Sequence, residues 1–313
     1  MTSEDLPIEV MREGARLWEQ GKTHEANSDN QMAIDCYLEM MRITFEDSTV
    51  WNAIATCYLH MGDMKQCESS LRRALELEPD DCEALNNLPL ILLDNDKPRE
   101  AEEVARRAVY HEEIRTTAYH SIGRARLAQD RPIHALEPLL KAVRGGTEDA
   151  GVFHTLGRVF VKLHDVHQAR KSFTKALELE GSTASILYDF GRFLIDIECY
   201  GEALAILRRA KDADPLSPLI LTTLAEALIG MVKTIEGPAR EDFAGEAMGL
   251  LNESLSHDVT LGKTWYHWGE IKVMFKDWPE VEKFIEASIE QGYVEPWSYA
   301  LLSVAKKELG KEE

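Results

Sequence analysis

The chain has 313 residues, with 35 basic and 55 acidic side chains and a formal net charge of −20. An apolar fraction of 44% and a charged fraction of 29% are typical of a folded protein and argue against a disordered or collagen-like chain. Because nucleic acids and anionic membranes present negative surfaces, the charge also argues against either as the main partner.

The N-terminus and the cysteines bear on the compartment. Residues 1–6 show no basic stretch leading into an apolar one, so we expect no secretory signal. No apolar run approaches the roughly 18 residues that a membrane-spanning helix needs. The five cysteines are odd in number and form no Cys-x-x-Cys pair, which favours reduced thiols over disulfides or a zinc site. We therefore expect a cytoplasmic protein.

A repeat of 34 residues organises the chain from residue 14 onward. Each copy predicts two amphipathic helices, because apolar residues recur at helical spacing in both halves. The fourth position is large, and the eighth and twentieth are mostly small, so that paired helices approach closely. Position 4 holds Leu17, Trp51, Leu85, Tyr119, Phe153 and Leu187, position 8 holds Gly21, Ala55, Pro89, Gly123, Gly157 and Gly191, and position 20 holds Ala33, Cys67, Ala101, Ala135, Ala169 and Ala203. Pro89 is the departure, and we expect it to kink or shift its helix.

The copies fill the chain without room for a second domain. In order they are residues 14–47, 48–81, 82–115, 116–149, 150–183, 184–217, 218–261 and 262–295. The seventh contains a 10-residue insertion near 231–243, which the sequence leaves open as extra helix with a tight turn or as a protruding loop. Residues 296–309 predict a final capping helix with a polar outer side, as terminal repeats require.

This pattern resembles the tetratricopeptide repeat family, whose motif is W-x2-L-G-x2-Y, then A-x3-F, an Ala and a closing Pro. The resemblance covers about nine-tenths of the chain. It implies an all-α fold, a right-handed superhelical solenoid of antiparallel helix pairs. It also implies a concave groove lined by positions 2, 5, 9, 12 and 13 of each first helix.

Signs of catalysis are weak. The sequence has no Walker motif and no Gly-x-Gly-x-x-Gly, and its regularly spaced glycines are explained by helix packing. His164 and His167 resemble a metal-binding pair, but they fall in a predicted turn without a third ligand. The tryptophans Trp265, Trp268, Trp278 and Trp297 lie largely at predicted core positions, which favours packing over ligand stacking. We expect no enzyme activity, no cofactor and no metal.

The predicted groove carries a basic centre. Residues 116–183 have a net charge of +3, whereas the rest of the chain has −23. We predict that position 9 supplies anion contacts, position 5 orients a bound backbone, and position 12 offers apolar contacts. The predicted peptide-binding residues are Arg124, Arg158 and Arg192 at position 9, Asn52, Asn86, His120, His154 and Tyr188 at position 5, and Leu127, Val161 and Ile195 at position 12. The alternative is an internal ladder in which Asp189 and Asp196 pair with Arg158 and Arg192.

The family's carboxylate clamp for chaperone tails is not present in its usual form. Asn87 matches the middle element, but Asn52, Thr56, Thr117 and Ser121 occupy the other positions. We therefore predict a non-enzymatic interaction scaffold that binds a peptide or an acidic or C-terminal protein segment in the concave groove. Two alternatives stay open: a self-associating assembly protein that uses its convex face, insertion and edges, and the regulatory subunit of an enzyme complex.

Overall fold

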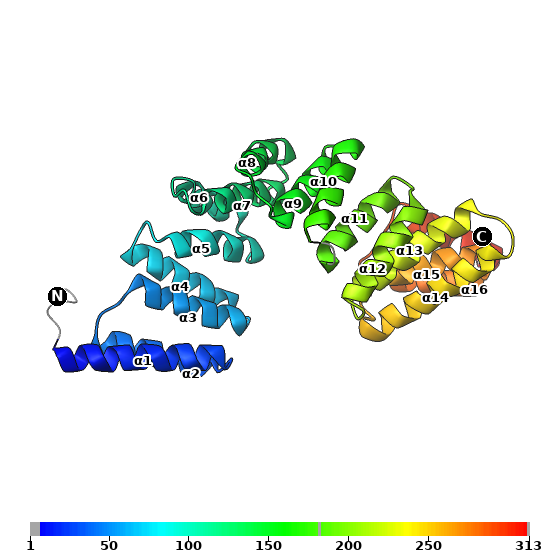
Figure 1. The fold of residues 1–313 in the computed structure, drawn as a ribbon. Helices are drawn as coiled ribbons and strands as arrows, with labels where there is room; N and C mark the ends of the chain where they lie inside the picture. The colour runs from blue at the N-terminus through cyan, green and yellow to red at the C-terminus, as the bar shows by residue number, and fades with distance from the viewer. Residues whose placement is uncertain (1–6, 181–182, 312–313) are drawn as a thin grey trace. The chain divides into compact units, whose positions relative to one another are not determined.

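A computed structural model of the protein describes residues 7–180 and 183–311. Residues 1–6, on which the absence of a secretory signal was judged, lie outside the described residues. The described part of the chain contains seventeen α-helices and no strand, which confirms the predicted all-α fold (Figure 1). The helices are α1 (Ile8–Ala26), α2 (Asn30–Ile43), α3 (Ser48–His60), α4 (Met64–Leu77), α5 (Cys82–Asp94), α6 (Pro98–Ala108), α7 (Arg115–Ala128), α8 (Pro132–Arg144), α9 (Ala150–Lys162), α10 (Val166–Leu179), α11 (Ala184–Asp196), α12 (Tyr200–Ala213), α13 (Pro218–Thr234), α14 (Ala239–His257), α15 (Gly262–Met274), α16 (Trp278–Glu290) and α17 (Ser298–Glu308).

The helix ends repeat as regularly as the helices. Aspartates begin several of them: Asp47, Asp81 and Asp149 each accept a hydrogen bond from a backbone N–H in the first turn of α3, α5 and α9. The turn inside a pair passes through the left-handed region at position 15 of the repeat. The residues with positive φ there are Ser28, Gly62, Asp96, Asp130, His164, Glu198 and Lys276. This shared turn conformation brings the second helix of each pair back along the first.

The two helices of a pair meet through a small residue at position 8 and a larger one at position 24. A Cβ atom added to Gly123 would lie 2.5 Å from the side chain of Leu139, and one added to Gly191 would lie 2.5 Å from that of Leu207. Both leucines are fully buried. Such contacts leave no space for a methyl group, so the glycines are required by packing rather than by backbone conformation.

Successive pairs pack so that their first helices lie together. Within the N-terminal half, α5 contacts α7 and α7 contacts α9, and within the C-terminal half α11 contacts α13 and α13 contacts α15. The second helices of successive pairs do not pack on each other to a comparable extent. Each run of pairs therefore curves toward its first helices, and the surface that these helices share is called the inner face below.

Two places where the sequence left the local structure open are settled. The insertion forms extra helix with a tight turn, because α13 continues to Thr234, α14 begins at Ala239, and Gly237 has a φ of 88° between them. Pro89 lies buried inside α5, which runs without a break from Cys82 to Asp94. In the repeat register the position facing Pro89 is Ala105, the smallest residue at position 24 of the six regular copies.

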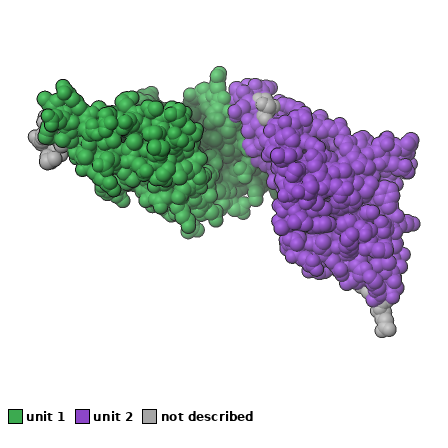
Figure 2. All heavy atoms as spheres, turned by 90° about the horizontal axis from the view of Figure 1, so that it is seen from below, with its two compact units in different colours: residues 1–165 green, residues 166–313 purple. Residues whose placement is uncertain are grey.

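The chain divides into two compact units, residues 1–165 and residues 166–313 (Figure 2). We call them unit 1 and unit 2. The boundary falls within the fifth repeat, between α9 and α10. Of the eleven predicted binding residues, Tyr188, Arg192 and Ile195 belong to unit 2, and the other eight belong to unit 1.

Candidate functional site: the inner faces of the two units

A row of neutral polar groups follows the inner face of unit 1. Thr117 donates a hydrogen bond of 2.6 Å to the side-chain oxygen of Asn86, whose amide nitrogen donates to Asn87 over 3.1 Å. On the next helices, Nε2 of His120 lies 3.0 Å from the hydroxyl of Thr155. These contacts join α5 to α7 and α7 to α9, so the row is held in place across three first helices.

Basic side chains lie beside this row. Arg124 is half-buried on α7, and Arg158 occupies the same repeat position on α9 and is exposed. Nδ1 of His120 lies 3.4 Å from a carboxylate oxygen of Asp149, which caps α9. The hydrogen bond with His120 lowers the pKa of Asp149, although burial would raise it. The backbone N–H of Gly151 and the charge of Arg124 lower this pKa further. The charges of Arg124 and Asp149 therefore attract each other, although the two side chains form no direct ion pair.

The remaining unit 1 residues differ in their exposure. Leu127 on α7 and Val161 and His154 on α9 are half-buried, which leaves part of each side chain at the surface. Asn52 is 3% exposed and donates to both oxygens of Asp81 over 3.0 Å. Because Asp81 caps α5, Asn52 ties α3 to the start of the next first helix. The structure thus places Asn52 in the interior and apart from the other predicted contacts.

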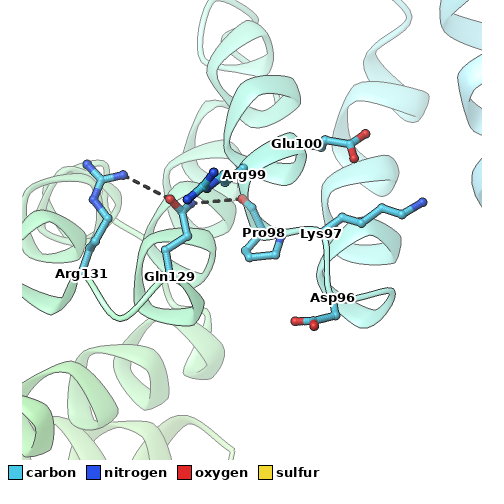
Figure 3. A pocket seen from close by; sticks show the side chains of 7 residues that line it. All are labelled: Asp96, Lys97, Pro98, Arg99, Glu100, Gln129 and Arg131. Atoms are coloured by element: carbon cyan, nitrogen blue, oxygen red, sulfur yellow. Dashed lines mark hydrogen bonds between the residues drawn. The ribbon is translucent and has the colours of Figure 1, made fainter.

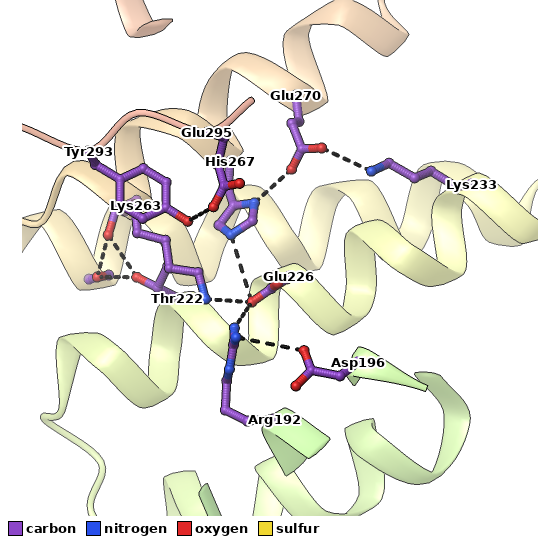
Figure 4. A network of polar contacts seen from close by, with 12 residues as sticks. Arg192, Asp196, Thr222, Glu226, Lys233, Lys263, His267, Glu270, Tyr293 and Glu295 are labelled. Atoms are coloured by element: carbon purple, nitrogen blue, oxygen red, sulfur yellow. Dashed lines mark hydrogen bonds and ion pairs between the residues drawn. The ribbon is translucent and has the colours of Figure 1, made fainter. Parts of the chain in front are cut away.

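The inner face of unit 2 is a closed network of charges (Figure 4). Arg192 on α11 donates to Glu226 on α13 over 2.9 Å and lies 3.8 Å from Asp196. Glu226 also accepts a 2.6 Å hydrogen bond from Lys263 on α15. The cation of Arg192 is therefore shared by two carboxylates of its own chain. Of the predicted neighbours, Tyr188 is half-buried, and burial raises its pKa, whereas Ile195 is buried.

The same network continues along α15. His267 is 4% exposed and shares a 2.7 Å hydrogen bond between Nδ1 and Glu270, which also accepts from Lys233 over 2.9 Å. Burial would raise the pKa of Glu270, but the hydrogen bond with His267 and the charge of Lys233 outweigh it and hold this pKa at about 2. Burial likewise opposes ionisation of Glu226, yet His267, Lys263 and Arg192 lower its pKa. Internal cations therefore favour the ionised forms of Glu226 and Glu270, whereas burial raises the pKa of Asp196.

The repeat register of the sequence contains a signal for this network. Glu226 stands 34 residues after Arg192 at the same repeat position, so it is the residue that the next first helix sets beside that arginine. Asp196 was named as a partner of Arg192 and lies 3.8 Å away. The shorter contact, to Glu226, follows from the same register arithmetic that predicted the ladder.

Away from the inner face, unit 1 has an open cavity of 470 Å³ at the turn between α5 and α6 (Figure 3). Pro98, Arg99, Gln129 and Arg131 are among the residues that line it. Gln129 donates to the carbonyl oxygen of Pro98 over 3.2 Å, and Arg131 donates to Gln129 over 3.2 Å. The repeat pattern did not indicate this cavity, whose walls are the turns after α5 and α7 and the first turn of α6.

A buried carboxylate beside this cavity holds two repeats together. Glu102 accepts from Arg106 at 2.6 Å, from Arg126 at 2.9 Å and from Gln129 at 3.1 Å. Burial opposes the charge, but the hydrogen bonds from Arg126, Arg106 and Gln129 lower the pKa of Glu102 to about 2. Glu68 makes the equivalent set of contacts 34 residues earlier. Its partners are Arg72 at 2.7 Å, Asn95 at 2.6 Å and Lys97 at 2.7 Å.

Within residues 7–180 and 183–311, no three His, Cys, Asp or Glu side chains are arranged to hold a metal ion. His164 lies in the turn after α9 with a positive φ, as the turn register requires.

None of the helices in the described ranges is both long and apolar enough to cross a bilayer.

Comparisons with known proteins agree with this architecture. The family described as Tetratricopeptide repeat matches residues 154–218, and the family described as Coatomer epsilon subunit matches residues 22–114. No curated protein matches the sequence.

Several solved structures share the fold at low sequence identity. A chain of the APC/C hetero-tetramer Cut9-Hcn1 aligns with a TM-score of 0.66 and 12% identity over 92% of this chain and 55% of that one. The type IV pilus biogenesis factor PilW aligns with a TM-score of 0.59 and 17% identity over 67% of this chain and 98% of that one. A tetratricopeptide repeat protein from Parabacteroides merdae aligns with a TM-score of 0.56 and 16% identity over 82% of this chain and 98% of that one. This chain thus spans about half the length of the Cut9-Hcn1 chain. The 34-residue register, the helix pairs and the repeat family that matches residues 154–218 identify the chain as a tetratricopeptide-repeat protein, and the solved structures share its fold.

Proposed function

We propose that the protein is a non-enzymatic interaction scaffold that binds an extended acidic segment of a partner protein along the inner face of unit 1. The observation that carries the proposal is the pair Arg124 and Arg158. They occupy one repeat position on α7 and α9, two helices in contact, so the register sets two positive charges on neighbouring helices. An anionic group between them relieves their repulsion and accepts hydrogen bonds from both guanidinium groups.

The surroundings of the two arginines suit a peptide. The polar row of Asn86, Thr117 and His120 offers hydrogen-bonding groups beside them, and Leu127 and Val161 offer partly exposed apolar surface. Arg192 has a different role in this proposal. Its charge is already met by Glu226 and Asp196, so we assign it to the stability of unit 2 and remove it from the ligand contacts.

The paired arginines suggest the kind of partner, and the cysteines suggest the compartment. A partner segment with clustered Asp and Glu, or with a free C-terminal carboxylate, matches the paired arginines. We place the protein in the cytoplasm, which is supported by five cysteines that form no disulfide among the described residues.

A binding experiment with a matched control tests the proposal. An immobilised library of acidic and C-terminal peptides is probed with wild-type protein, with the double variant Arg124→Ala and Arg158→Ala, and with the control Arg16→Ala and Arg42→Ala. The control removes the same number of positive charges from exposed positions of α1 and α2, where Arg16 pairs with Glu13 and Arg42 pairs with Glu39 on their own helices. We expect the first variant to bind at least about tenfold more weakly, with a shallower salt dependence, and the control to bind like wild type. An equal loss of peptide affinity in both variants, or no loss in either variant, would contradict the proposal.

A further inference from the structure

The open cavity of unit 1 is lined by two arginines that come from different turns (Figure 3). Arg99 belongs to the first turn of α6, and Arg131 belongs to the turn after α7. The cavity has a volume of 470 Å³, which is within the range of sites that bind small ligands. None of its lining residues is among the peptide contacts proposed for the inner face, so the cavity needs an explanation of its own.

The repeated contacts between pairs explain most of the charges at the cavity but not Arg99. Lys97 and Arg131 both stand at position 16 of their repeats, where they bind Glu68 and Glu102 of the preceding pair. Arg99 stands at position 18, outside this repeated contact. It is exposed, and its side chain makes no hydrogen bond or ion pair with another residue of the described ranges. No contact within unit 1 therefore accounts for this arginine.

Arg131 is only partly used by its contacts within unit 1. Its Nη1 atom donates to Gln129 over 3.2 Å and to Glu102 over 3.4 Å. Nε and Nη2 donate to no residue in the described part of the chain, and the side chain is 41% exposed. Gln129 is itself held by a 3.2 Å hydrogen bond to the carbonyl oxygen of Pro98. The guanidinium group is therefore fixed in place and keeps donors for a ligand.

Basic side chains outnumber the carboxylates around this cavity. Glu68, Glu100 and Glu102 are bound by five basic residues, which are Arg72, Lys97, Arg106, Arg126 and Arg131. Asp96 and Arg99 add one charge of each sign at the cavity itself. These ten residues have a surplus of two positive charges, in a chain whose net charge is −20.

The carboxylates that line the cavity lie apart from its two arginines. In Figure 3 the side chains of Asp96 and Glu100 point away from Gln129 and Arg131. Glu100 accepts a 2.5 Å hydrogen bond from Arg72, which lies outside the cavity. The part of the cavity that Arg99 and Arg131 line is therefore its positive part.

A phosphate monoester suits this positive part better than a carboxylate does. It carries a charge of about −1.5 to −2 at pH 7 and three strong acceptor oxygens. It can therefore neutralise the surplus of two charges and accept hydrogen bonds from two guanidinium groups at once. A carboxylate has one charge and two oxygens, so it would leave half of the surplus in place.

We propose that the cavity binds a phosphate monoester through Arg99 and Arg131. The group belongs either to a phosphorylated side chain of a partner protein or to a small organic phosphate, because both present the same dianion. This site is separate from the inner face of unit 1, where Arg124 and Arg158 are proposed to bind an acidic segment.

An NMR titration of the full-length protein tests the two arginines directly. The signals of the arginine Nε–H groups are followed as inorganic phosphate, O-phospho-L-serine or L-glutamate is added at constant ionic strength. Arg99→Gln is the test variant, because it removes no contact within the described protein and should not affect folding. Arg12→Gln is the matched control, because Arg12 is an exposed arginine of α1 that does not line the cavity.

We expect saturable shifts of the Arg99 and Arg131 signals in wild-type protein with both phosphate probes, and weaker binding of L-glutamate. In Arg99→Gln, the shift of Arg131 should report an affinity for phosphoserine at least about fivefold weaker, whereas Arg12→Gln should bind like wild type. Circular dichroism checks that both variants keep the helicity and Tm of wild type.

A degenerate peptide pool with a central phosphoserine distinguishes the two sources of the phosphate. Fluorescence anisotropy compares it with the same pool carrying serine. Tighter binding of the phosphorylated pool than of free phosphoserine would identify a partner protein as the source, and equal affinity would identify a small organic phosphate; either result supports the site.

Three results would overturn the proposal. The first is the absence of saturable shifts at Arg99 and Arg131, and the second is binding of L-glutamate as tight as that of phosphoserine. The third is a loss of phosphoserine affinity in the double variant Arg124→Ala and Arg158→Ala but not in Arg99→Gln. That result would mean that the inner face, and not the cavity, binds the phosphate.

Discussion

The inner faces of the two units share one repeat register but differ in the charges that position 9 places on neighbouring helices. In unit 1, position 9 carries Arg124 and then Arg158, so neighbouring first helices present the same sign of charge. In unit 2, position 9 carries Arg192 and then Glu226, and the two form a 2.9 Å ion pair. One residue type at one repeat position is therefore suited to a ligand in the first case and to internal pairing in the second. What decides the role is the residue 34 positions further along the chain.

The largest expected effect comes from opening the unit 2 network. Glu226→Leu removes the carboxylate shared by Arg192 and Lys263, which leaves the buried ammonium of Lys263 without its partner and Arg192 with the more distant Asp196 at 3.8 Å. We expect the free energy of unfolding to fall by about 3 kcal/mol, because an uncompensated buried charge costs that much. Chemical denaturation measures the change.

A triple variant provides the control for this prediction. Adding Arg192→Met and Lys263→Met to Glu226→Leu replaces the cluster with apolar groups, and we expect it to recover most of the lost stability. A loss below about 1 kcal/mol for Glu226→Leu alone would show that the network is not needed for stability.

The next effect tests a charge cluster of unit 1 through its pH dependence. The folded pKa of Glu102 is lowered to about 2 from its ordinary value of 4.5, so its stabilisation is fully present above that ordinary value and is lost as the pH falls toward 2. Between pH 7 and pH 3 we expect the wild type to lose about 2 kcal/mol more than Glu102→Gln, as measured by urea unfolding. Parallel pH profiles for the two proteins would contradict this role of Glu102.

Packing between paired helices should contribute equally to the stability of the two units, in contrast to the charges on their inner faces. Gly123→Ala in unit 1 and Gly191→Ala in unit 2 each force a methyl group against a buried leucine at the same 2.5 Å distance. We expect each to lower the free energy of unfolding by about 1–2 kcal/mol. Gly201→Ala is the control, because its added Cβ meets no atom within 4 Å and helix propensity favours alanine. Unequal costs at Gly123 and Gly191 would mean that the pairs of the two units pack differently.

The smallest effect on stability is expected at the proposed ligand contact. Arg124→Ala removes a side chain without an ion pair within the described residues, and we expect a change within about 0.5 kcal/mol. Arg192→Ala leaves Glu226 with Lys263 and His267 and should cost about 1–2 kcal/mol. Thermal unfolding of the two variants side by side makes the comparison. A larger loss at Arg124 than at Arg192 would reverse the roles assigned here.

The repeat register predicts the fold because each pair repeats the same local contacts. A small residue at position 8, such as Gly123, and a large residue at position 4 were enough to locate the helix pairs. Register also predicts contacts across pairs, because Arg192 meets Glu226 34 residues later, and Glu68 and Glu102 make equivalent contacts in successive repeats.

Other features depend on contacts that register does not encode. The burial of Asn52 depends on its contact with Asp81 at the cap of α5. The helical form of the insertion depends on how α13 and α14 pack against each other over their added turns. Trp297, which was expected at a core position, stands at the N-terminal end of α17 and is 70% exposed. The sequence pattern assigned each of these residues to a class of position, but only the three-dimensional contacts determine its exposure.

The contact between positions 8 and 24 also constrains how such a chain can evolve. In the third pair the bulky residue is Pro89 at position 8, and position 24 is Ala105, whereas in the fourth pair the sizes are reversed as Gly123 and Leu139. The combined volume is shared across the helix pair rather than fixed at either site. Substitutions at the two positions are therefore expected to be tolerated together and selected against singly, so a lineage crosses from one arrangement to the other only through paired change.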